Sequence, residues 1–258
     1  MKKTVGLPIL FVMLSAFGFA QDLGQVKNDI DAERFDTAKK TLKTLIKSNP
    51  NNGKLFFYLG DVYLAQKESD SALEVFNKGL LAKDKGFLSN IGLAQLDLDA
   101  KKNADAVAKF DKASKEIKKK DVDETLLIAK AYIKSENPNY KAAIDLINKV
   151  LTKNMSNASA HLLLGDAHFA SGNSNDAYAS YRNAYDYDNS VLLAKMNLAK
   201  ITKNAKAFNE AVKSFDEILK INSNFGPVYR ELAETYYFWP NSEQNKYQEY
   251  ISKALGFY

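Results

Sequence analysis

The sequence repeats with a period of 34 to 36 residues, and this period constrains the fold more than any other feature. Its units begin near residues 19, 53, 87, 122, 158, 192 and 226. In the unit at 158–191, Gly165 lies on a first amphipathic stretch, while Ala177 and Tyr181 lie on a second one after a polar turn. Two such helices cannot bury both apolar faces alone, so each unit needs neighbours. The period therefore predicts an all-α solenoid of antiparallel helix pairs.

The other units keep the same pattern. Each unit after the first has a small residue at its eighth position, preceded by Leu or Ile. Six units open their second half with Ala, followed four residues later by a large side chain. The small residues are Gly60, Ala94, Ala129, Gly165, Ala199 and Ala233. The pattern has departures, among them Val26 in place of the small residue of the first unit and a two-residue insertion in the turn at 135–140.

This pattern resembles the tetratricopeptide repeat family, whose 34-residue unit is a helix, a turn and a second helix. The resemblance covers about nine tenths of the chain. It implies a right-handed superhelical solenoid over residues 21–258, with about seven units, the last incomplete. The second helices have predicted N-terminal cap pairs that precede the opening alanine. These pairs are Asp36 with Thr37, Asp70 with Ser71, and Asn175 with Asp176.

The last unit leaves two possibilities for its second helix. The helix includes Tyr247, Ile251 and Ala254, or it begins after a longer loop and includes Ala254 and Tyr258. Terminal repeats normally carry a polar outer face, whereas this chain ends in apolar residues. We therefore expect the sequence to be a piece of a longer solenoid.

The first twenty residues have the composition of a secretory signal peptide. Lys2 and Lys3 precede an almost wholly apolar stretch that ends with small residues at Gly18 and Ala20. We expect cleavage after Ala20, and the alternative is an uncleaved anchor. The chain has no cysteine, so it can form no disulfide and accept no lipid at a cysteine after the signal. The short signal and the Lys- and Asn-rich composition are typical of bacteria, and they predict export to the periplasm or an outer-membrane-associated location.

No motif for catalysis, a cofactor or a metal is found in the sequence. It shows no Ser-His-Asp set, phosphate-binding glycine loop or zinc spacing. The two histidines, His161 and His168, are separated by about 10 Å along one helix, which is too far for a shared tetrahedral ion, so they are expected to pack. Basic residues number 36 and acidic residues 31, and the one dense basic run at 118–120 fits a solvated helix end. We therefore expect no enzyme, cofactor or nucleic-acid partner, and no membrane span after signal cleavage.

The family resemblance implies that the first helices line a concave groove, with unit positions 2, 5, 9, 12 and 13 facing it. Positions 5 and 12 form two apolar rows, and position 9 forms a polar row between them. We expect exposed apolar side chains to bind an extended or helical peptide, although these rows could instead pack neighbouring first helices together. The predicted partner-binding residues are Phe57, Asp61, Leu64, Ile91, Gln95, Leu126, Lys130, Leu162, Asp166, Phe169, Met196 and Lys200.

Two functions fit this sequence. The first is a non-enzymatic scaffold of the bacterial cell envelope that holds a segment of another envelope protein in the concave groove. The second is an N-terminal targeting arm of a longer protein, whose C-terminal part carries an enzymatic or envelope-anchoring domain. Some family members grip acidic tails with basic and asparagine residues at such positions, whereas units 2 to 5 have mostly apolar and acidic residues there. The identity of the partner and the oligomeric state stay open.

Overall fold

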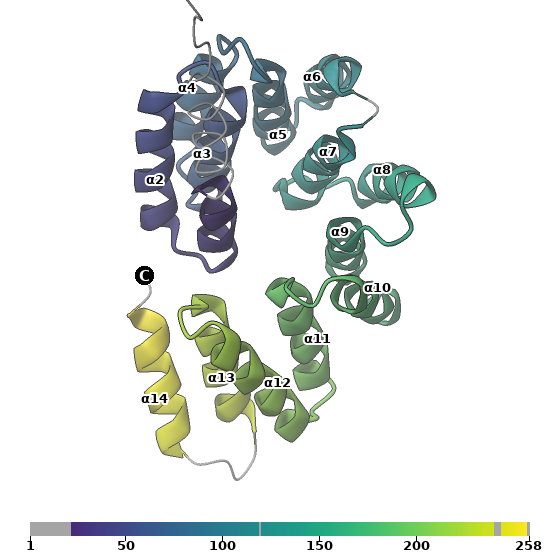
Figure 1. The fold of residues 1–258 in the computed structure, drawn as a ribbon. Helices are drawn as coiled ribbons and strands as arrows, with labels where there is room; N and C mark the ends of the chain where they lie inside the picture. Colours follow the sequence, from purple (N-terminus) through teal and green to yellow (C-terminus); the bar gives the residue numbers. More distant parts are fainter. Residues whose placement is uncertain (1–21, 119, 240–243, 257–258) are drawn as a thin grey trace, which may run out of the picture.

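The computed structural model describes residues 22–118, 120–239 and 244–256 (Figure 1). The predicted signal peptide and the two C-terminal residues lie outside this part of the chain, as does the centre of the basic run at 118–120. Within the described residues, no helix is both long enough and apolar enough to cross a membrane.

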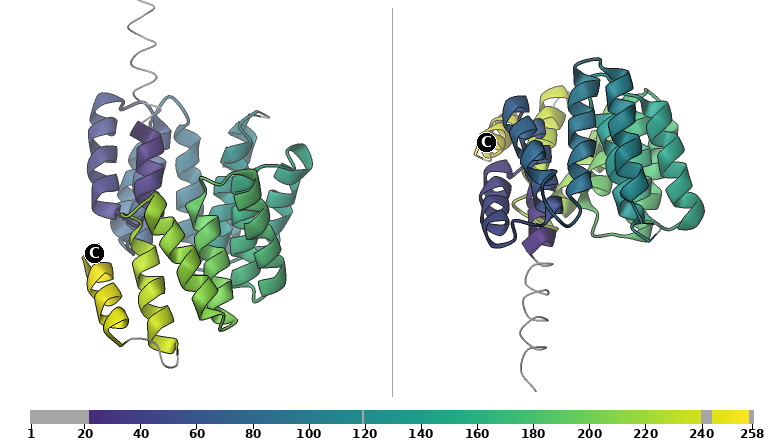
Figure 2. Two further views of the ribbon diagram at one scale, coloured as in Figure 1. Left: turned by 60° about the horizontal axis from the view of Figure 1, so that its bottom comes forward. Right: turned by 90° about the horizontal axis from the view of Figure 1, so that it is seen from above.

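The described chain is a succession of helices joined by short turns. Residues 22–31 form a helix, and a single 3₁₀ turn, η1 (Gly86–Leu88), leads directly into α5. The α-helices that follow are α2 (Phe35–Ser48), α3 (Gly53–Ala65), α4 (Ser69–Gly79), α5 (Ser89–Asp99), α6 (Asn103–Glu116), α7 (Val122–Lys134), α8 (Tyr140–Lys153), α9 (Ala158–Ala170), α10 (Ser174–Tyr187), α11 (Leu192–Asn204), α12 (Phe208–Ile221), α13 (Gly226–Phe238) and α14 (Gln244–Leu255). They pair antiparallel, and the pairs stack into a right-handed superhelical solenoid (Figures 1 and 2).

An aromatic ring from the second helix of a unit packs directly against small residues of the neighbouring helices. The fully buried ring of Phe76 on α4 lies between Gly60 on α3 and Gly92 on α5. A β-carbon added at Gly60 would lie 2.2 Å from Phe76 Cε1, and one at Gly92 would lie 2.1 Å from Cζ. Tyr181 makes the same close approach to Gly165, as the sequence pattern predicts. The eighth position is small because the ring of the second helix occupies the space of a side chain.

The turn between the two helices of a unit has the same backbone conformation in five of the units. The fifteenth residue of five units has a positive φ, and only one of these residues is glycine: Glu33, Lys67, Lys101, Gly172 and Lys206. In the second unit, Lys67 N donates to Leu64 O and Glu68 N donates to Tyr63 O, which is the Schellman arrangement that ends a helix. The next helix then begins within two residues.

This early start makes the predicted cap pairs wrong. The residues before α2 and α4 are Arg34 and Glu68, and neither side chain caps its helix. Asn173, two residues before the predicted pair, caps α10 by accepting from Asp176 N. The acidic residues of the predicted pairs, Asp36, Asp70 and Asp176, instead lie in the first turn of their helices, where the positive end of the helix dipole stabilises their charge.

The last unit takes the first of the two predicted forms. Helix α14 covers Gln244–Leu255, and its Ala254 is buried. Tyr250 of α14 stacks on Tyr236 of α13 with ring centroids 5.6 Å apart. The final helix therefore packs on α13 in the way that the earlier pairs pack.

The solenoid curls until its two ends meet, so that the first helices lie beside α13 and α14 (Figures 1 and 2). Ala32, just after the first helix, is fully buried in the same core cluster as Phe225, Val228 and Leu232. The described apolar core is divided into two clusters, one running from the first helix to α9 and the other formed by α11 to α14 with Ala32. The molecule therefore has the outline of a closed ring.

Candidate functional site

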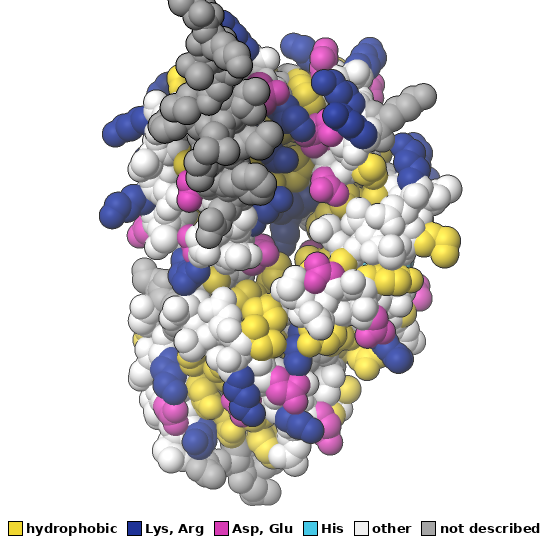
Figure 3. Space-filling view, in the orientation of Figure 1, with side chains coloured by type: hydrophobic (Ala, Val, Ile, Leu, Met, Phe, Trp, Pro, Cys, Tyr) yellow, Lys and Arg dark blue, Asp and Glu magenta, His cyan; other side chains and the backbone are white. Residues whose placement is uncertain are grey.

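The ring surrounds a central hollow, which we define as the space lined by Asp31 and by the inner faces of α3, α7, α9 and α11. Figure 3 shows the molecule hollowed at its centre, with Lys or Arg side chains deep inside. Four charged residues from four different helical units, Asp31, Asp61, Lys130 and Asp166, are close enough for their charges to act on one another. The first helices of the repeat thus bring three carboxylates and one lysine to one place.

Lys130 links two units across this hollow. Its ammonium group on α7 donates to Asp61 Oδ2 on α3 at 2.9 Å, although the two residues are 69 positions apart in the sequence. Desolvation alone would lower the pKa of Lys130, but the neighbouring carboxylate of Asp61, with Asp31 and Asp166 beyond it, raises that pKa. The lysine is therefore firmly charged inside the hollow.

Asp166 is the best hydrogen-bonded carboxylate of the hollow. It accepts from Tyr181 Oη at 2.9 Å and from Asn197 Nδ2 at 3.2 Å, and so joins α9 to α10 and α11. Desolvation raises the pKa of Asp166, although Lys134 and the Tyr181 hydroxyl partly oppose that shift. The same environment raises the pKa of Tyr181. The ionised form of Asp166 is thus disfavoured by its surroundings.

A lysine and glutamate network continues the polar lining from α11 to α13. Buried Lys203 donates to Glu231 Oε2 and to Glu234 Oε2, each at 2.7 Å. Lys200, one turn earlier on α11, lies 3.2 Å from Glu231 Oε1. Desolvation opposes the charge of Lys203, yet its hydrogen bonds to the two glutamates raise its pKa. These pairs fix adjacent first helices relative to each other.

Three charged groups near the hollow lack such partners. Among the described residues, Asp31, Lys54 and Lys134 have no oppositely charged atom within 4.0 Å. Desolvation lowers the pKa of Lys54, and the nearby charges of Lys27 and Lys85 add to that shift. Desolvation likewise raises the pKa of Asp31. Lys54 is half-buried, so an arriving acceptor would offset the cost of its unpaired charge, whereas Asp31 and Lys134 are exposed.

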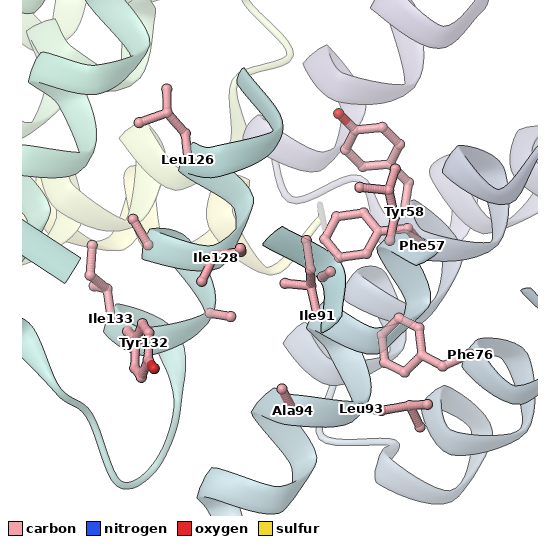
Figure 4. Close-up of a cluster of buried hydrophobic side chains, with 14 of the residues drawn as sticks. Phe57, Tyr58, Phe76, Ile91, Leu93, Ala94, Leu126, Ile128, Tyr132 and Ile133 are labelled. Carbon is pink, nitrogen blue, oxygen red and sulfur yellow. The ribbon is translucent and has the colours of Figure 1, made fainter. Parts of the chain in front are cut away.

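The structure brings together the predicted polar row, but it buries much of the predicted apolar rows. The expectation that apolar side chains lie exposed along the groove is wrong for Phe57, Ile91, Leu126 and Met196, which are 4%, 0%, 4% and 6% exposed. Figure 4 shows the first three in the cluster between neighbouring first helices. The tight curvature of the ring presses the first helices together, so these side chains form the packing between units.

The other predicted residues divide into two groups. Gln95 is buried, while Leu64, Leu162 and Phe169 keep part of their surface. Asp61, Lys130, Asp166 and Lys200 also keep part of their surface and line the hollow. The half-buried apolar residues are thus the ones that a bound segment could still touch.

Three residues of the hollow were missed at the sequence level. Asp31 and Lys134 occupy position 13 of their units, and Lys54 occupies position 2. Both positions belong to the inward-facing set of the repeat, so the register of the repeat could have found them.

Of the two histidines, His161 packs α9 against its surroundings, while His168 is half-buried. His161 is buried, its Nε2 lies 2.9 Å from Met155 O, and its ring stacks on Tyr187 with centroids 5.3 Å apart. Across the part of the chain that the structure describes, no group of three or more His, Cys, Asp or Glu residues is arranged to hold a metal ion.

Comparison with known proteins agrees with this architecture. Residues 23–86, 126–190 and 162–227 match the model of a family described as Tetratricopeptide repeat. A TPR repeat-containing protein of Methanocaldococcus jannaschii is 24% identical over 235 residues, which cover 85% of this chain and 40% of that protein. The chain thus spans less than half the length of this curated relative.

Solved structures show the same fold. A structure of the human IFIT1 dimer with PPP-AAAA superposes with a TM-score of 0.61 at 13% identity, covering 86% of this chain and 55% of that one. A chain of the APC/C hetero-tetramer Cut9–Hcn1 gives a TM-score of 0.52 at 14% identity, with coverages of 90% and 45%.

The matched segments cover more than half of the chain, and the same helix pairs recur through the described structure. This fold is that of a scaffold for protein–protein interaction, and proteins of the family bind protein or peptide partners. The chain belongs to the tetratricopeptide repeat family.

Proposed function

We propose that this chain is a non-enzymatic scaffold of the bacterial cell envelope that holds an extended segment of another envelope protein in the central hollow. The observation that carries this proposal is the polar lining of the hollow, in which Asp31, Lys54 and Lys134 face inward without ion-pair partners. Of these three residues Lys54 is half-buried, and a charge in such a place is costly unless it is paired. A bound segment that supplies hydrogen bonds and charges would offset this cost.

The lining also suggests what kind of segment fits. Charges of both signs line the hollow, so neither a purely acidic nor a purely basic segment would be favoured throughout. An extended backbone offers donors and acceptors that suit such a lining. Half-buried Leu162 and Phe169 would add apolar contact, worth about 1.5–3 kcal/mol for a fully buried side chain before ordering costs. Specificity would then come mainly from the placement of the charges.

The envelope location rests on residues 1–20, which have the sequence of a secretory signal. We propose that the mature chain acts in the periplasm or at the outer membrane.

Site-specific photo-crosslinking in cells tests the binding site. A photoreactive amino acid is placed at Lys134 or Lys54 in the hollow, and at Lys141 or Lys149 on the exposed side of α8 as matched controls. We expect the two hollow positions to capture the same envelope protein, and the controls to capture none of it. Equal capture from α8, or different proteins from the two hollow positions, would refute a binding site in the hollow.

A second function has an observation in its favour. The curated relative extends well beyond the region that it shares with this chain, which covers only 40% of it. This difference in length supports a targeting arm whose C-terminal part carries an enzymatic or envelope-anchoring domain. The mass of the native gene product would separate the two functions, because a targeting arm requires a product much larger than the 258-residue chain.

A further inference from the structure

The two edges of the solenoid differ in the side chains that they expose. At one edge, which we call the junction edge, each second helix ends and the first helix of the next unit begins. The turns between the two helices of each unit lie at the other edge. The junction edge exposes the large apolar side chains of Leu80, Leu81, Met155, Tyr187 and Ile221, and those of Leu81 and Met155 are 83% and 74% exposed. Among the described residues, the turns within the first six units expose no side chain of this kind.

Exposed lysines accompany the apolar side chains of the junction edge in the first four units. They lie at the ends of α2, α4, α6 and α8 and in the loops that follow these helices. The exposed lysines are Lys47, Lys78, Lys83, Lys115, Lys118, Lys120, Lys149 and Lys153. We define the basic edge as these eight lysines together with Leu80, Leu81 and Met155. In Figure 3, Lys and Arg side chains gather over α5, α6 and α8, with hydrophobic side chains between them.

The charge of the basic edge is not balanced locally. Its stretches, 47–51, 78–84, 115–123 and 149–156, expose three carboxylates among the described residues. These are Asp84, Glu116 and Asp123. Within the same part of the chain, Lys78 is the one lysine of the edge with a carboxylate oxygen within 4.0 Å, that of Glu74. In the fifth unit, by contrast, Asp186 and Asp188 lie on either side of Tyr187, so the excess of positive charge belongs to the first four units.

The N-terminal apolar segment joins the solenoid at the junction edge. The helix at 22–31 is the first helix of its unit, so it begins at this edge, as α3 and α9 do. The almost wholly apolar residues 4–19 come shortly before it in the sequence. Such a segment enters the membrane during export. While the segment is attached, it therefore holds the junction edge nearest to the lipid.

Apolar side chains set among lysines suit the interface of a lipid bilayer. The apolar side chains enter the headgroup region, while the lysines are attracted to anionic phosphate groups. We propose that the basic edge docks the mature solenoid on an anionic phospholipid surface, with Leu81 and Met155 inserted among the headgroups. This inference goes beyond the proposed function, because it concerns where the scaffold is held and requires no segment in the hollow.

Flotation with vesicles tests the docking. The mature chain from Gln21 is mixed with vesicles of phosphatidylglycerol and phosphatidylethanolamine, or with neutral vesicles of phosphatidylcholine. Four variants are compared with it, and circular dichroism checks that each retains its helix content. Two change the basic edge, and two matched controls change the outward side of α4 and α6 or the turns. The variants are Leu81→Asp with Met155→Asp; Lys83→Gln with Lys118→Gln and Lys153→Gln; Leu73→Asp with Val107→Asp; and Lys101→Gln with Lys102→Gln and Lys206→Gln.

We expect the native chain to bind the anionic vesicles and to bind the neutral ones at least about tenfold more weakly, and we expect salt to weaken the binding. Each variant of the basic edge should lower the affinity by about tenfold or more, because it removes inserted apolar surface or several attracted charges. The control variants should change the affinity by less than about twofold. Equal binding to both kinds of vesicle, an equal loss in the controls, or no binding by the native chain would overturn the proposal.

A fluorescent label shows which edge meets the lipid. The chain has no cysteine, so an environment-sensitive dye can be attached at Leu81→Cys on the basic edge or at Lys101→Cys in a turn. On anionic vesicles the emission from Leu81→Cys should shift to the blue, and that from Lys101→Cys should not. Equal shifts at the two positions would show adsorption without a preferred edge and would overturn the proposal. Capture of a protein by a photoreactive group at Leu81, without vesicle binding, would assign this edge to a protein partner instead.

Discussion

Adding one methyl group at Gly92 should destabilise the protein, whereas the same addition at Gly24 should stabilise it. Both glycines lie in helices, where alanine is favoured over glycine by about 1 kcal/mol. Nothing lies within 4 Å of a β-carbon added at Gly24. The helix 22–31 should therefore gain nearly the whole of that preference when Gly24 becomes alanine.

At Gly92 the space is already occupied. An added β-carbon would lie 2.1, 2.3 and 2.4 Å from three atoms of the Phe76 ring, whereas carbon atoms in contact are normally about 3.5–4.0 Å apart. The ring has no room to withdraw toward α3, because the β-carbon position of Gly60 is only 2.2 Å from its Cε1. Overpacking costs about 1–3 kcal/mol, and the blocked retreat favours the upper end of this range. After the gain in helix preference, Gly92→Ala should lose about 2 kcal/mol.

Urea unfolding followed by circular dichroism measures both variants, and hydrogen exchange of α3–α5 and of residues 22–31 places each effect in the chain. A solenoid can unfold unit by unit, so the exchange data are needed to assign the change. We expect faster exchange around Phe76 in Gly92→Ala and slower exchange of the first helix in Gly24→Ala.

A double change tests the cause. Phe76→Leu removes the ring from the crowded place, so the cost of Gly92→Ala should shrink or reverse in that background. Two results would refute crowding of the Phe76 side chain as the cause: Gly92→Ala at least as stable as Gly24→Ala, or an equal loss of unfolding free energy from Gly92→Ala in the Phe76→Leu background.

Four further predictions concern the turns, the hollow and the N-terminus. Lys67→Gly should raise the free energy of unfolding by about 1 kcal/mol, because Lys67 has a φ of 61° that costs a residue with a β-carbon about 1–2 kcal/mol. Urea unfolding measures the change, and a loss of stability would show that Lys67 is not strained in this turn. The pKa of Asp166 is raised in the folded chain, so the protonated carboxyl favours folding. This contribution to stability is fully present below the ordinary pKa of 3.8 and is lost as the pH rises through the raised pKa. Asp166→Asn should therefore be more stable than the native chain at pH 7 and equal to it near pH 3, and a constant difference across a pH series of unfolding curves would argue against desolvation as the cause. Lys203→Met should lower the melting temperature, because it leaves the buried carboxylate of Glu231 without its lysine; breaking such a pair costs about 3–5 kcal/mol of unfolding free energy, and Lys200 beside Glu231 favours the low end. Adding Glu231→Gln should recover part of the loss, and no recovery would show that the buried charge is not the cause. N-terminal sequencing of protein from cells should begin at Gln21, after cleavage behind Ala20, and a mature chain that starts at Met1 would refute export by cleavage.

The sequence by itself predicts the repeat unit, because the small and large residues that determine its helix pair all lie within about 34 residues. The small residue at Gly165 and the ring at Tyr181 imply the close approach that the structure contains. The sequence does not predict the left-handed turns, because Lys67 and Lys101 occupy the position at which only Gly172 lacks the β-carbon that disfavours a positive φ. A turn held by its flanking helices does not need glycine, so the composition of the turn gives no local signal.

Only the tertiary structure decides which inward-facing residues are exposed. The repeat register places Phe57 and Ile91 on the same inner side as Asp61 and Lys130, but the rotation from one unit to the next determines which of them the neighbouring helix covers. That rotation depends on packing between units, and small differences in it add up along the solenoid. After several units they bring Arg230 to Glu33. No pattern within a single repeat predicts this contact between the ends of the chain, because it depends on the sum of all the rotations between them.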